Sequence, residues 1–227
     1  MKRKIGLVIA VEEAPFERVY GLPKTKTKLH GFEVSCYERP TYELYAVSSG
    51  VGEVMGAAST QFLIDHYGVD LILNYGVVGA LEEKAASSSL CLISAVVDYA
   101  FDLSEIDNVP PGFHSEESSL AIPTDPFLRA LAKEAFPSLP ELVLASGDRF
   151  VGKAEDKAKL HQQFGASVCD MEGAGILRTA KRNGVPALLV KSVADTLFGG
   201  AGEYRLKSDE AAAKCAAILD HLMASLK

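Results

Sequence analysis

Acidic residues follow several apolar segments of this chain. Glu12 and Glu13 come directly after the first apolar run, Glu172 opens a helix-like segment, and Asp195 follows a late apolar run. Cleavage of the bond between a sugar and a heterocyclic base builds positive charge on the sugar and negative charge on the base. A carboxylate beneath the sugar and an acid beside the base stabilise these charges. Each acidic residue alone is more typical of a cap or a turn, but their combination predicts glycosidic-bond cleavage.

Glycine-rich segments follow two other apolar runs. They are Ser49-Gly50-Val51-Gly52 and Gly76-Val77-Val78-Gly79, and glycine allows a ligand to approach the backbone closely. The second segment lacks the spacing of a dinucleotide-binding fingerprint and the Gly-Lys-Ser/Thr of a phosphate-binding loop. Taken by itself, it predicts a tight turn between a strand and a loop.

Strand-like and helix-like segments alternate along the whole chain and position these residues. Near-continuous apolar strands indicate a sheet covered on both faces, so we expect an α/β fold in one domain spanning residues 1–227. In open α/β sheets, ligands bind beyond the carboxyl ends of the strands, which is where the acidic and glycine-rich segments stand. The predicted buried strands are residues 4–11, 70–74, 90–97, 142–146 and 186–193, and residues 31–37 and 42–48 are predicted as an antiparallel pair.

Helices are predicted where capping residues and periodic apolar residues coincide. They cover residues 52–67, a segment opened by Thr124-Asp125-Pro126, residues 153–164 and 170–183, and a segment from Ser208 to the C-terminus. Residues 98–122 lack clear periodicity, so we expect a functional loop or a partner-facing segment there. The patch of Lys24, Lys26 and Lys28 predicts the solvated edge of a β-hairpin.

Composition narrows the class of protein. The formal net charge of −7 argues against a nucleic-acid partner, since phosphate backbones attract clustered Lys and Arg. No apolar run approaches the roughly 20 residues that cross a bilayer, so we expect a cytoplasmic protein without membrane contact. The four cysteines form no metal-ligand or disulfide pattern, and no spacing of His and carboxylate residues resembles a metal site. We therefore predict no metal and no cofactor.

The order of these motifs resembles that of the bacterial 5′-methylthioadenosine/S-adenosylhomocysteine nucleosidases, within the nucleoside phosphorylase superfamily, over nearly the whole chain. The most specific part is Met171-Glu172 at the start of a helix, with Asp195 after the following strand. The resemblance implies a single three-layer α/β/α domain with a central mixed, twisted sheet. It also implies a homodimer, in which residues 98–113, with Tyr99, Phe101 and Phe113, complete the pocket of a neighbour. The other segments that carry the resemblance are Ile5-Gly6 with the acidic residues after that strand, Ser49-Gly50-Val51-Gly52, Asn74-Tyr75-Gly76-Val77-Val78-Gly79-Ala80-Leu81, Ser146-Gly147-Asp148-Arg149-Phe150 and Lys191-Ser192-Val193-Ala194.

The resemblance also implies a role for each site residue. Asp195 would donate a proton toward purine N7, because a neutral base leaves more readily than an anion. Glu172 would hydrogen-bond the ribose hydroxyls and stabilise the cationic transition state. The remaining contacts to the substrate are expected from Met171 against the sugar, Phe150 stacked on the purine, the backbone of Val151 at the base edge, and Val51, Gly76 and Val77.

The residue that activates water is expected in the acidic pair after the first strand. A gap-free alignment to the family puts Ala14 at this position. A shortened turn brings Glu13, or in second place Glu12, into the role, and the hydrolytic mechanism is incomplete if neither reaches. Two further departures are Val77, where the family usually has a small hydroxyl residue, and Ala194, where it commonly has serine. They leave the details of the substrate open.

Water is the better supported nucleophile. Asn74 replaces the arginine that phosphorylases of the superfamily place before the glycine segment, and Glu12 and Glu13 would repel a phosphate dianion. Arg18 and Arg149 are the cations through which phosphorolysis stays an alternative. Hydrolysis of a purine nucleoside is thus the predicted function, with 5′-methylthioadenosine/S-adenosylhomocysteine as the leading substrate. A nucleoside-binding module without turnover is a further alternative, because the three departures from the family pattern lie at the site.

Overall fold

Strands from the whole length of the chain join in one mixed sheet. The computed structural model describes residues 2–86, 88–198 and 200–226. Within them the strands follow the order β10-β6-β8-β9-β5-β1-β4-β3-β2, and β7 pairs with β6. The strands are β1 (Arg3–Ile9), β2 (Thr25–Leu29), β3 (Phe32–Glu38), β4 (Tyr42–Ser48), β5 (Leu71–Ala80), β6 (Leu90–Asp98), β7 (Ile122–Pro123), β8 (Glu141–Ser146), β9 (Val168–Asp170) and β10 (Ala187–Asp195).

One half of the sheet closes on itself around β5. This strand pairs in parallel with both β1 and β10, and its last residues pair with β9. Because β10 also pairs with β6, and β6 reaches β9 through β8, these strands form a closed circuit. The ends of β1, β9 and β10 consequently come close to the second half of β5, where Ile9 pairs with Tyr75 and Asp195 with Gly79.

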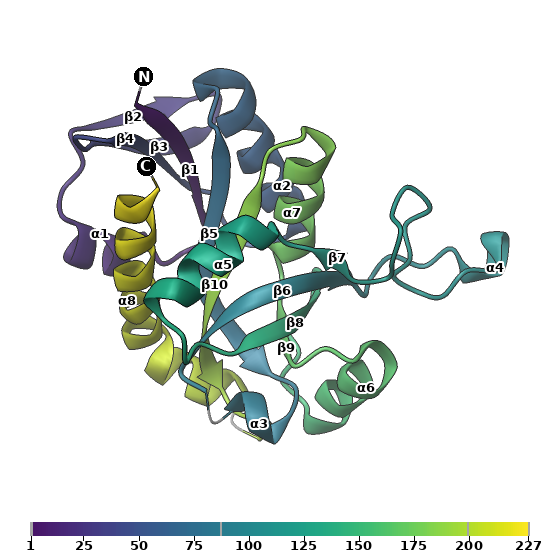
Figure 1. Cartoon of the computed structure of the whole chain (residues 1–227). Helices are drawn as coiled ribbons and strands as arrows, with labels where there is room; N and C mark the ends of the chain where they lie inside the picture. The colour runs from purple at the N-terminus through teal and green to yellow at the C-terminus, as the bar shows by residue number, and fades with distance from the viewer. Residues whose placement is uncertain (1, 87, 199, 227) are drawn as a thin grey trace.

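Helices cover both faces of the sheet (Figure 1). Helices α1, α5 and α8 lie on one face, and α2 and α7 lie on the other. Residues of β1 alternate between these layers: Ile5 and Leu7 belong to the core beneath α8, whereas Val8 belongs to the core beneath α7. None of the described helices combines the length and the apolarity needed to cross a membrane. The helices are α1 (Glu13–Tyr20), α2 (Glu53–Phe62) continued by the π-helical turn η1 (Leu63–Tyr67), α3 (Glu83–Ala86), α4 (Ser104–Asp107), α5 (Pro126–Ala135), α6 (Ala154–Phe164), α7 (Gly173–Arg182) and α8 (Gly200–Ser225).

Several helix boundaries agree with the local sequence signals. Asp125 caps α5 by accepting the N–H of Leu128 (2.9 Å), and Pro126 occupies the first turn, where its missing N–H has no partner to lose. Gly68 ends the predicted 52–67 segment with φ of 61°, a left-handed conformation that glycine adopts without steric cost. These predictions are confirmed.

Three predictions of elements are wrong. Strand β5 continues through Gly76 and Gly79, which pair with Lys191 and Asp195 of β10 instead of forming a turn. Neither glycine has a positive φ, and at Gly79 the missing β-carbon leaves space for Asp195. Helix α8 begins at Gly200 and contains the predicted cap Ser208, since serine is also tolerated inside long helices. Helix α7 begins at Gly173, because the chain before it forms β9.

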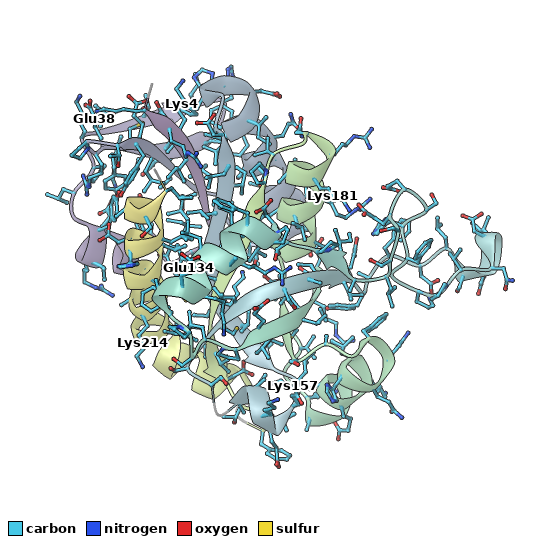
Figure 2. The ribbon with its side chains drawn as sticks, in the orientation of Figure 1. Lys4, Glu38, Glu134, Lys157, Lys181 and Lys214 are labelled. Carbon is cyan, nitrogen blue, oxygen red and sulfur yellow. The ribbon has the colours of Figure 1, made fainter. Side chains whose placement is uncertain are left out.

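The segment between β6 and β7 differs from the rest of the chain. In Figure 1 it extends away from the sheet and carries only the short helix α4. This agrees with the prediction of an irregular segment at residues 98–122. At the opposite end of the sheet, β2 forms the predicted hairpin edge, where Lys26 forms an ion pair with Glu17 (2.5 Å). The body of the fold thus lies between a charged edge and a projecting segment (Figure 2).

Candidate active site

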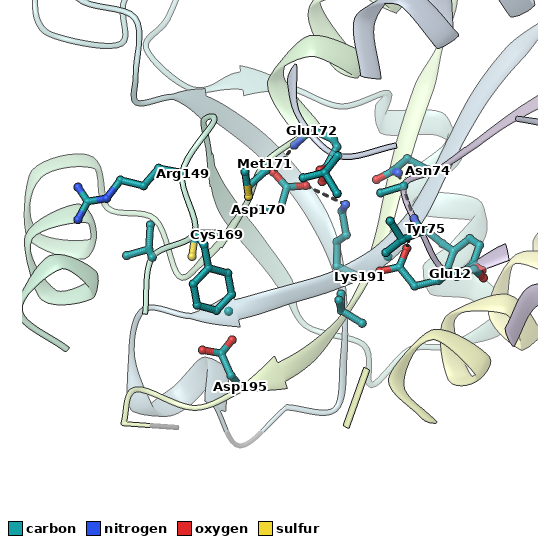
Figure 3. A pocket seen from close by; sticks show the side chains of 18 residues that line it. Glu12, Asn74, Tyr75, Arg149, Cys169, Asp170, Met171, Glu172, Lys191 and Asp195 are labelled. Carbon is teal, nitrogen blue, oxygen red and sulfur yellow. Dashed lines mark hydrogen bonds and ion pairs between the residues drawn. The ribbon is translucent and has the colours of Figure 1, made fainter. Parts of the chain in front are cut away.

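A cavity that opens to solvent lies where the ends of β1, β9 and β10 meet the second half of β5 (Figure 3). Asp195 and Glu172 both line this one cavity, as the predicted chemistry requires. In the part of the chain that the structure describes, no group of three His, Cys, Asp or Glu side chains is arranged to hold a metal ion. Of the residues predicted for the site, those that line the cavity are Glu12, Val51, Gly76, Val77, Phe150, Val151, Met171, Glu172 and Asp195.

The two acidic residues after β1 have different surroundings: Glu12 lines the cavity, and Glu13 does not. Glu12 is buried in the cavity wall just before α1, whereas Glu13 is the first residue of that helix. The Glu13 carboxylate accepts hydrogen bonds from Ser35 (3.0 Å) and Lys26 (3.1 Å) of the β2–β3 hairpin. Consecutive residues of a helical turn point about 100° apart, so only one of the pair faces the cavity. Of the two residues predicted for the role, Glu12 lines the cavity and Glu13 does not.

The Glu12 carboxylate is held by its own turn. Its Oε2 accepts the N–H of Val11 (3.2 Å), and the Tyr75 hydroxyl donates to the main-chain oxygen of Glu12. Burial raises the pKa of Glu12, while the Val11 N–H and the charge of Lys191 oppose that rise. A carboxylate with a raised pKa is a stronger proton acceptor, which suits a group that removes a proton from water.

Glu172 stands immediately before α7 without capping that helix. Its Oε1 instead accepts the N–H of Gly52, 3.0 Å away, at the start of α2. This contact explains why a glycine-rich segment distant in sequence belongs to the same site. Burial and then the nearby charge of Asp170 raise the pKa of Glu172. The carboxylate therefore lies in a desolvated, acidic part of the cavity.

Lys191 is a site residue to which sequence reasoning assigned no role. It is 2% exposed in the middle of β10, and its Nζ lies 2.8 Å from Asp170 Oδ2. Burial would lower the pKa of Lys191, but the charges of Asp170 and Glu172 raise it. A β-carbon built on Gly76 would lie 3.6 Å from Lys191 Nζ and 3.8 Å from Glu12 Oε2, so these opposite charges flank the same glycine. A lysine directly after the apolar run Ala187–Val190 was the signal available in the sequence.

Asp195 ends β10 on the other side of the cavity. It is 2% exposed, and its Oδ2 lies 2.5 Å from Nζ of Lys157 in α6. A β-carbon built on Gly79 would lie only 2.7 Å from Asp195 Oδ1, so glycine leaves the room that this carboxylate needs. Figure 3 shows Asp195 and Glu172 approaching the cavity from opposite sides. Two acidic groups thus face each other across a space that is open to a ligand.

The comparisons with known proteins agree with this architecture. A family model described as Phosphorylase superfamily matches residues 4–224. The chain belongs to this superfamily. It is 33% identical over 224 residues to the aminodeoxyfutalosine nucleosidase of Helicobacter pylori, covering 93% of this chain and 96% of that protein. It is 28% identical over 198 residues to the 5′-methylthioadenosine/S-adenosylhomocysteine nucleosidase of Staphylococcus saprophyticus, covering 81% and 82%.

A solved structure supports the same assignment. The crystal structure of the 5′-methylthioadenosine/S-adenosylhomocysteine nucleosidase from Helicobacter pylori with butyl-thio-DADMe-Immucillin-A matches this phosphorylase-superfamily chain with a TM-score of 0.93. The sequences are 29% identical, and all of both chains is covered. The predicted superfamily and the predicted fold class, a mixed sheet between layers of helices, are confirmed.

The loop between β8 and α6 supplies the aromatic part of this superfamily site. Phe150 is exposed at the rim, whereas Val151 is buried in the wall. The guanidinium of Arg149 pairs with Asp156 of α6, and in Figure 3 it points away from the cavity. An aromatic ring at the rim presents a face on which a planar base stacks.

Arginines that hold a phosphate dianion are the feature expected for phosphorolysis and not for hydrolysis. Arg149 is turned outward, and Arg18 is exposed on α1 and does not line the cavity. Asn74, which stands where an arginine was expected for phosphorolysis, donates to the main-chain oxygen of Val8 (3.0 Å). Among the lining residues, Lys191 is the cation whose charge lies within the site. A single lysine already surrounded by carboxylates is a poor host for a dianion.

Proposed function

We propose that this chain is a nucleosidase that hydrolyses the N-glycosidic bond of a purine nucleoside. The observation that carries the proposal is the shared cavity, into which Asp195 opens on one side and Glu172 and Glu12 on the other. The names of the relatives, all nucleosidases, agree with the hydrolase predicted from the sequence. A purine nucleoside bound across the cavity meets an acid at its base and carboxylates at its sugar.

The reaction requires two proton transfers and the stabilisation of positive charge on the sugar. Asp195 donates a proton to purine N7 as the bond from C1′ to N9 breaks and its electron pair leaves with the base. Glu172 hydrogen-bonds the ribose hydroxyls, and its charge stabilises the cationic sugar. Glu12 accepts a proton from the water molecule whose oxygen bonds to C1′. Lys191 lies beside Glu12 and Asp170, and its positive charge offsets the repulsion among these carboxylates.

The remaining residues of the cavity orient the nucleoside. In the proposal, Phe150 stacks on the purine, the backbone of Val151 contacts the base edge, and Met171 packs against the sugar. Val51, Gly76 and Val77 complete the wall around the ribose and the attacking water. Gly76 allows close approach, since a β-carbon there would already stand within 4 Å of both Glu12 and Lys191.

Water is the nucleophile in this proposal. Glu12, Glu172 and Asp195 place negative charge around the cavity, whereas Arg18 and Arg149 are directed elsewhere. A phosphate dianion therefore finds repulsion without the planar, always-charged donors that hold it in phosphorolysis. The proposed steps need only these side chains and water.

The names of the relatives define the candidate substrates. They are 5′-methylthioadenosine, S-adenosylhomocysteine and aminodeoxyfutalosine. The experiment incubates the protein with each nucleoside, with adenosine and with inosine, in the presence and absence of phosphate, and measures the free base. We expect base and free sugar at a rate that is independent of phosphate. Release only with phosphate would replace the proposal by phosphorolysis, and tight binding without release under any condition would replace it by a binding module.

The proposed enzyme acts as a homodimer. The support is a face formed by α2, α7 and the projecting residues 98–122, where Val54 is 72% exposed and Arg178 pairs with Glu116 (2.9 Å). Exposed apolar side chains beside charged ones are typical of a protein interface. Light scattering after size exclusion measures the mass, and Val54→Asp should shift it toward that of the monomer.

The cytoplasmic location predicted from the sequence stays a prediction. All four cysteines, Cys36, Cys91, Cys169 and Cys215, are free thiols, which suits a reducing compartment. Fractionation of cells that express the tagged protein measures this directly.

A further inference from the structure

A lysine outside the cavity lining is completely buried against the proton donor. Lys157 is 0% exposed, and its Nζ lies 2.5 Å from Asp195 Oδ2 and 2.6 Å from the main-chain oxygen of Thr196. Burial of an ammonium group is unfavourable unless hydrogen bonds and an opposite charge compensate for the lost water. Lysines on helices usually keep the charge in solvent, as Lys159 does on the same helix with 76% exposure. The position of Lys157 is therefore exceptional within α6.

The two oxygens of Asp195 have different surroundings. Oδ2 is bound by Lys157, which is not part of the cavity wall, whereas Asp195 itself lines the cavity. Oδ1 lies beside Gly79, another lining residue, where a β-carbon would come within 2.7 Å. Helix α6 follows directly after the loop that carries Phe150 and Val151, so the lysine is delivered from behind the part of the site that holds the base.

We propose that Lys157 is a positioning residue for proton donation by Asp195. It fixes Oδ2, directs Oδ1 to purine N7, and balances the negative charge that remains on Asp195 after the proton has left. Because this role presupposes the proposed nucleosidase reaction, it deepens that function and does not replace it.

The proton and electron changes at this end of the site are complete without another reactant. The C1′–N9 bond breaks and its electron pair goes to the base. The proton moves from Asp195 to N7, Asp195 ends as a carboxylate, and Lys157 stays an ammonium throughout. The water that bonds to C1′ gives its proton to Glu12. Exchange with solvent then removes this proton from Glu12 and returns one to Asp195.

Two substrates whose leaving groups differ in their need for a proton can distinguish this role from a merely structural one. A purine leaves slowly as an anion and needs protonation at N7. A 4-nitrophenolate is stable as an anion and leaves without a proton. Loss of a residue that acts through Asp195 slows only the first class, whereas a misfolded or distorted site slows both.

The experiment compares Lys157→Met with the matched variant Lys159→Met on the same helix. Each is assayed on the preferred purine nucleoside and on the 4-nitrophenyl β-riboside with the same 5′ group. For Lys157→Met we expect kcat on the purine nucleoside to fall roughly tenfold or more with little change in KM, while release of 4-nitrophenolate stays within about twofold. Lys159→Met should match the wild type on both substrates. If Lys157→Met does not fold, Lys157→Gln, which keeps a donor without the charge, should show the same pattern.

Two results would overturn the role of Lys157: an equal loss on both substrates, or full activity on the purine nucleoside. Asp195→Asn separates this failure from failure of the proposed function. If Asp195→Asn loses purine hydrolysis while the Lys157 variants keep it, only the inference about Lys157 fails. If Asp195→Asn keeps purine hydrolysis, the proposed proton donor is wrong, and the role of Lys157 falls with it.

Discussion

Two buried lysines stand at the two ends of one cavity, and the charges around them differ. At the base end, Lys157 pairs with Asp195 at 2.5 Å; at the sugar end, Lys191 pairs with Asp170 at 2.8 Å and also faces further carboxylates. Among the described residues, Lys157 pairs with Asp195 at the base end, whereas Lys191 is near Asp170, Glu172 and Glu12 at the sugar end. A cation beside a carboxyl group favours the loss of its proton. An excess of carboxylates suits a cationic sugar and a group that accepts a proton.

The largest effect is expected at the sugar end, where substitutions of the adjacent residues Glu12 and Glu13 are compared. Glu12→Gln should lower kcat/KM by roughly 10²–10⁴, because an amide accepts no proton from water. Glu13→Gln is the matched control and should change it little, since that side chain contacts Lys26 and Ser35 instead of the cavity. Initial rates of base release measure both. A larger loss in the Glu13 variant would contradict the assignment of Glu12.

The difference in charge between the two ends should appear in the free energy of unfolding when each lysine is replaced. Lys191→Met should lower the free energy of unfolding by about 3–5 kcal/mol, because buried carboxylates then lack their cation. Lys157→Met should cost less, since Lys157 pairs with one carboxylate, Asp195, whereas Lys191 is near three. Urea unfolding at neutral pH measures both values. Equal losses would show that the two ends do not differ in excess charge.

The fold was largely predictable because strand and helix signals are local. The buried strands, the hairpin edge and the Asp125 cap all follow from short stretches of sequence. The continuation of β5 through Gly76 and Gly79 was missed, because glycine signals both a turn and a need for space. The need for space is at Gly79 and arises from Asp195, more than a hundred residues later in the chain. Strand β9 was missed because Val168–Asp170 is too short to show a pattern.

The site was predictable where strand ends determine it. Asp195 follows a predicted strand, so its place at the ligand-binding edge of the sheet could be inferred from the sequence. Glu172 follows β9, which was not predicted, and its place in the site came from the family resemblance. The choice between Glu12 and Glu13 depended on where α1 begins, and a shift of one residue reverses which side chain faces inward. The partners of Lys157 and Lys191 lie 38 and 21 positions away, which no local pattern reveals.

Addition of a single methyl group should disturb the two ends unequally. Gly79→Ala places a β-carbon 2.7 Å from Asp195 Oδ1 and 3.3 Å from Cys169 Sγ, so Asp195 or the backbone must shift. We expect a loss of about 1–3 kcal/mol in transition-state stabilisation, measured as kcat/KM. Gly76→Ala meets nothing closer than Lys191 Nζ at 3.6 Å and should have the smaller effect. The reverse order would show that the space beside Gly79 is not needed for Asp195.

Behind the sugar end, Glu53 is a further acidic group and adds a dependence on pH. The Ser146 hydroxyl lies 2.5 Å from Glu53 Oε1 and 2.5 Å from Asp170 Oδ1. A hydroxyl has one hydrogen to donate, so one of the two carboxyl groups must carry a proton to complete the second hydrogen bond. Asp170 pairs with Lys191, which leaves the proton on Glu53. Burial and then the charge of Asp170 raise the pKa of Glu53 from 4.5 to about 8.

The smallest expected effect is the resulting loss of stability toward alkaline pH. Between pH 4.5 and about 8 the folded chain holds a proton on Glu53 that the unfolded chain releases, so stability falls as pH rises through this window. The slope from this group is at most about 1.4 kcal/mol per pH unit. Glu53→Gln removes the titrating group but keeps a donor for Ser146, so its free energy of unfolding should fall less than that of the wild type between pH 6 and pH 8. The control Glu134→Gln, at an exposed position of α5, should show the same pH dependence as the wild type. If the free energy of unfolding changes with pH equally in all three proteins, Glu53 does not hold the proton. The sugar end would then carry less excess charge than its carboxylates suggest.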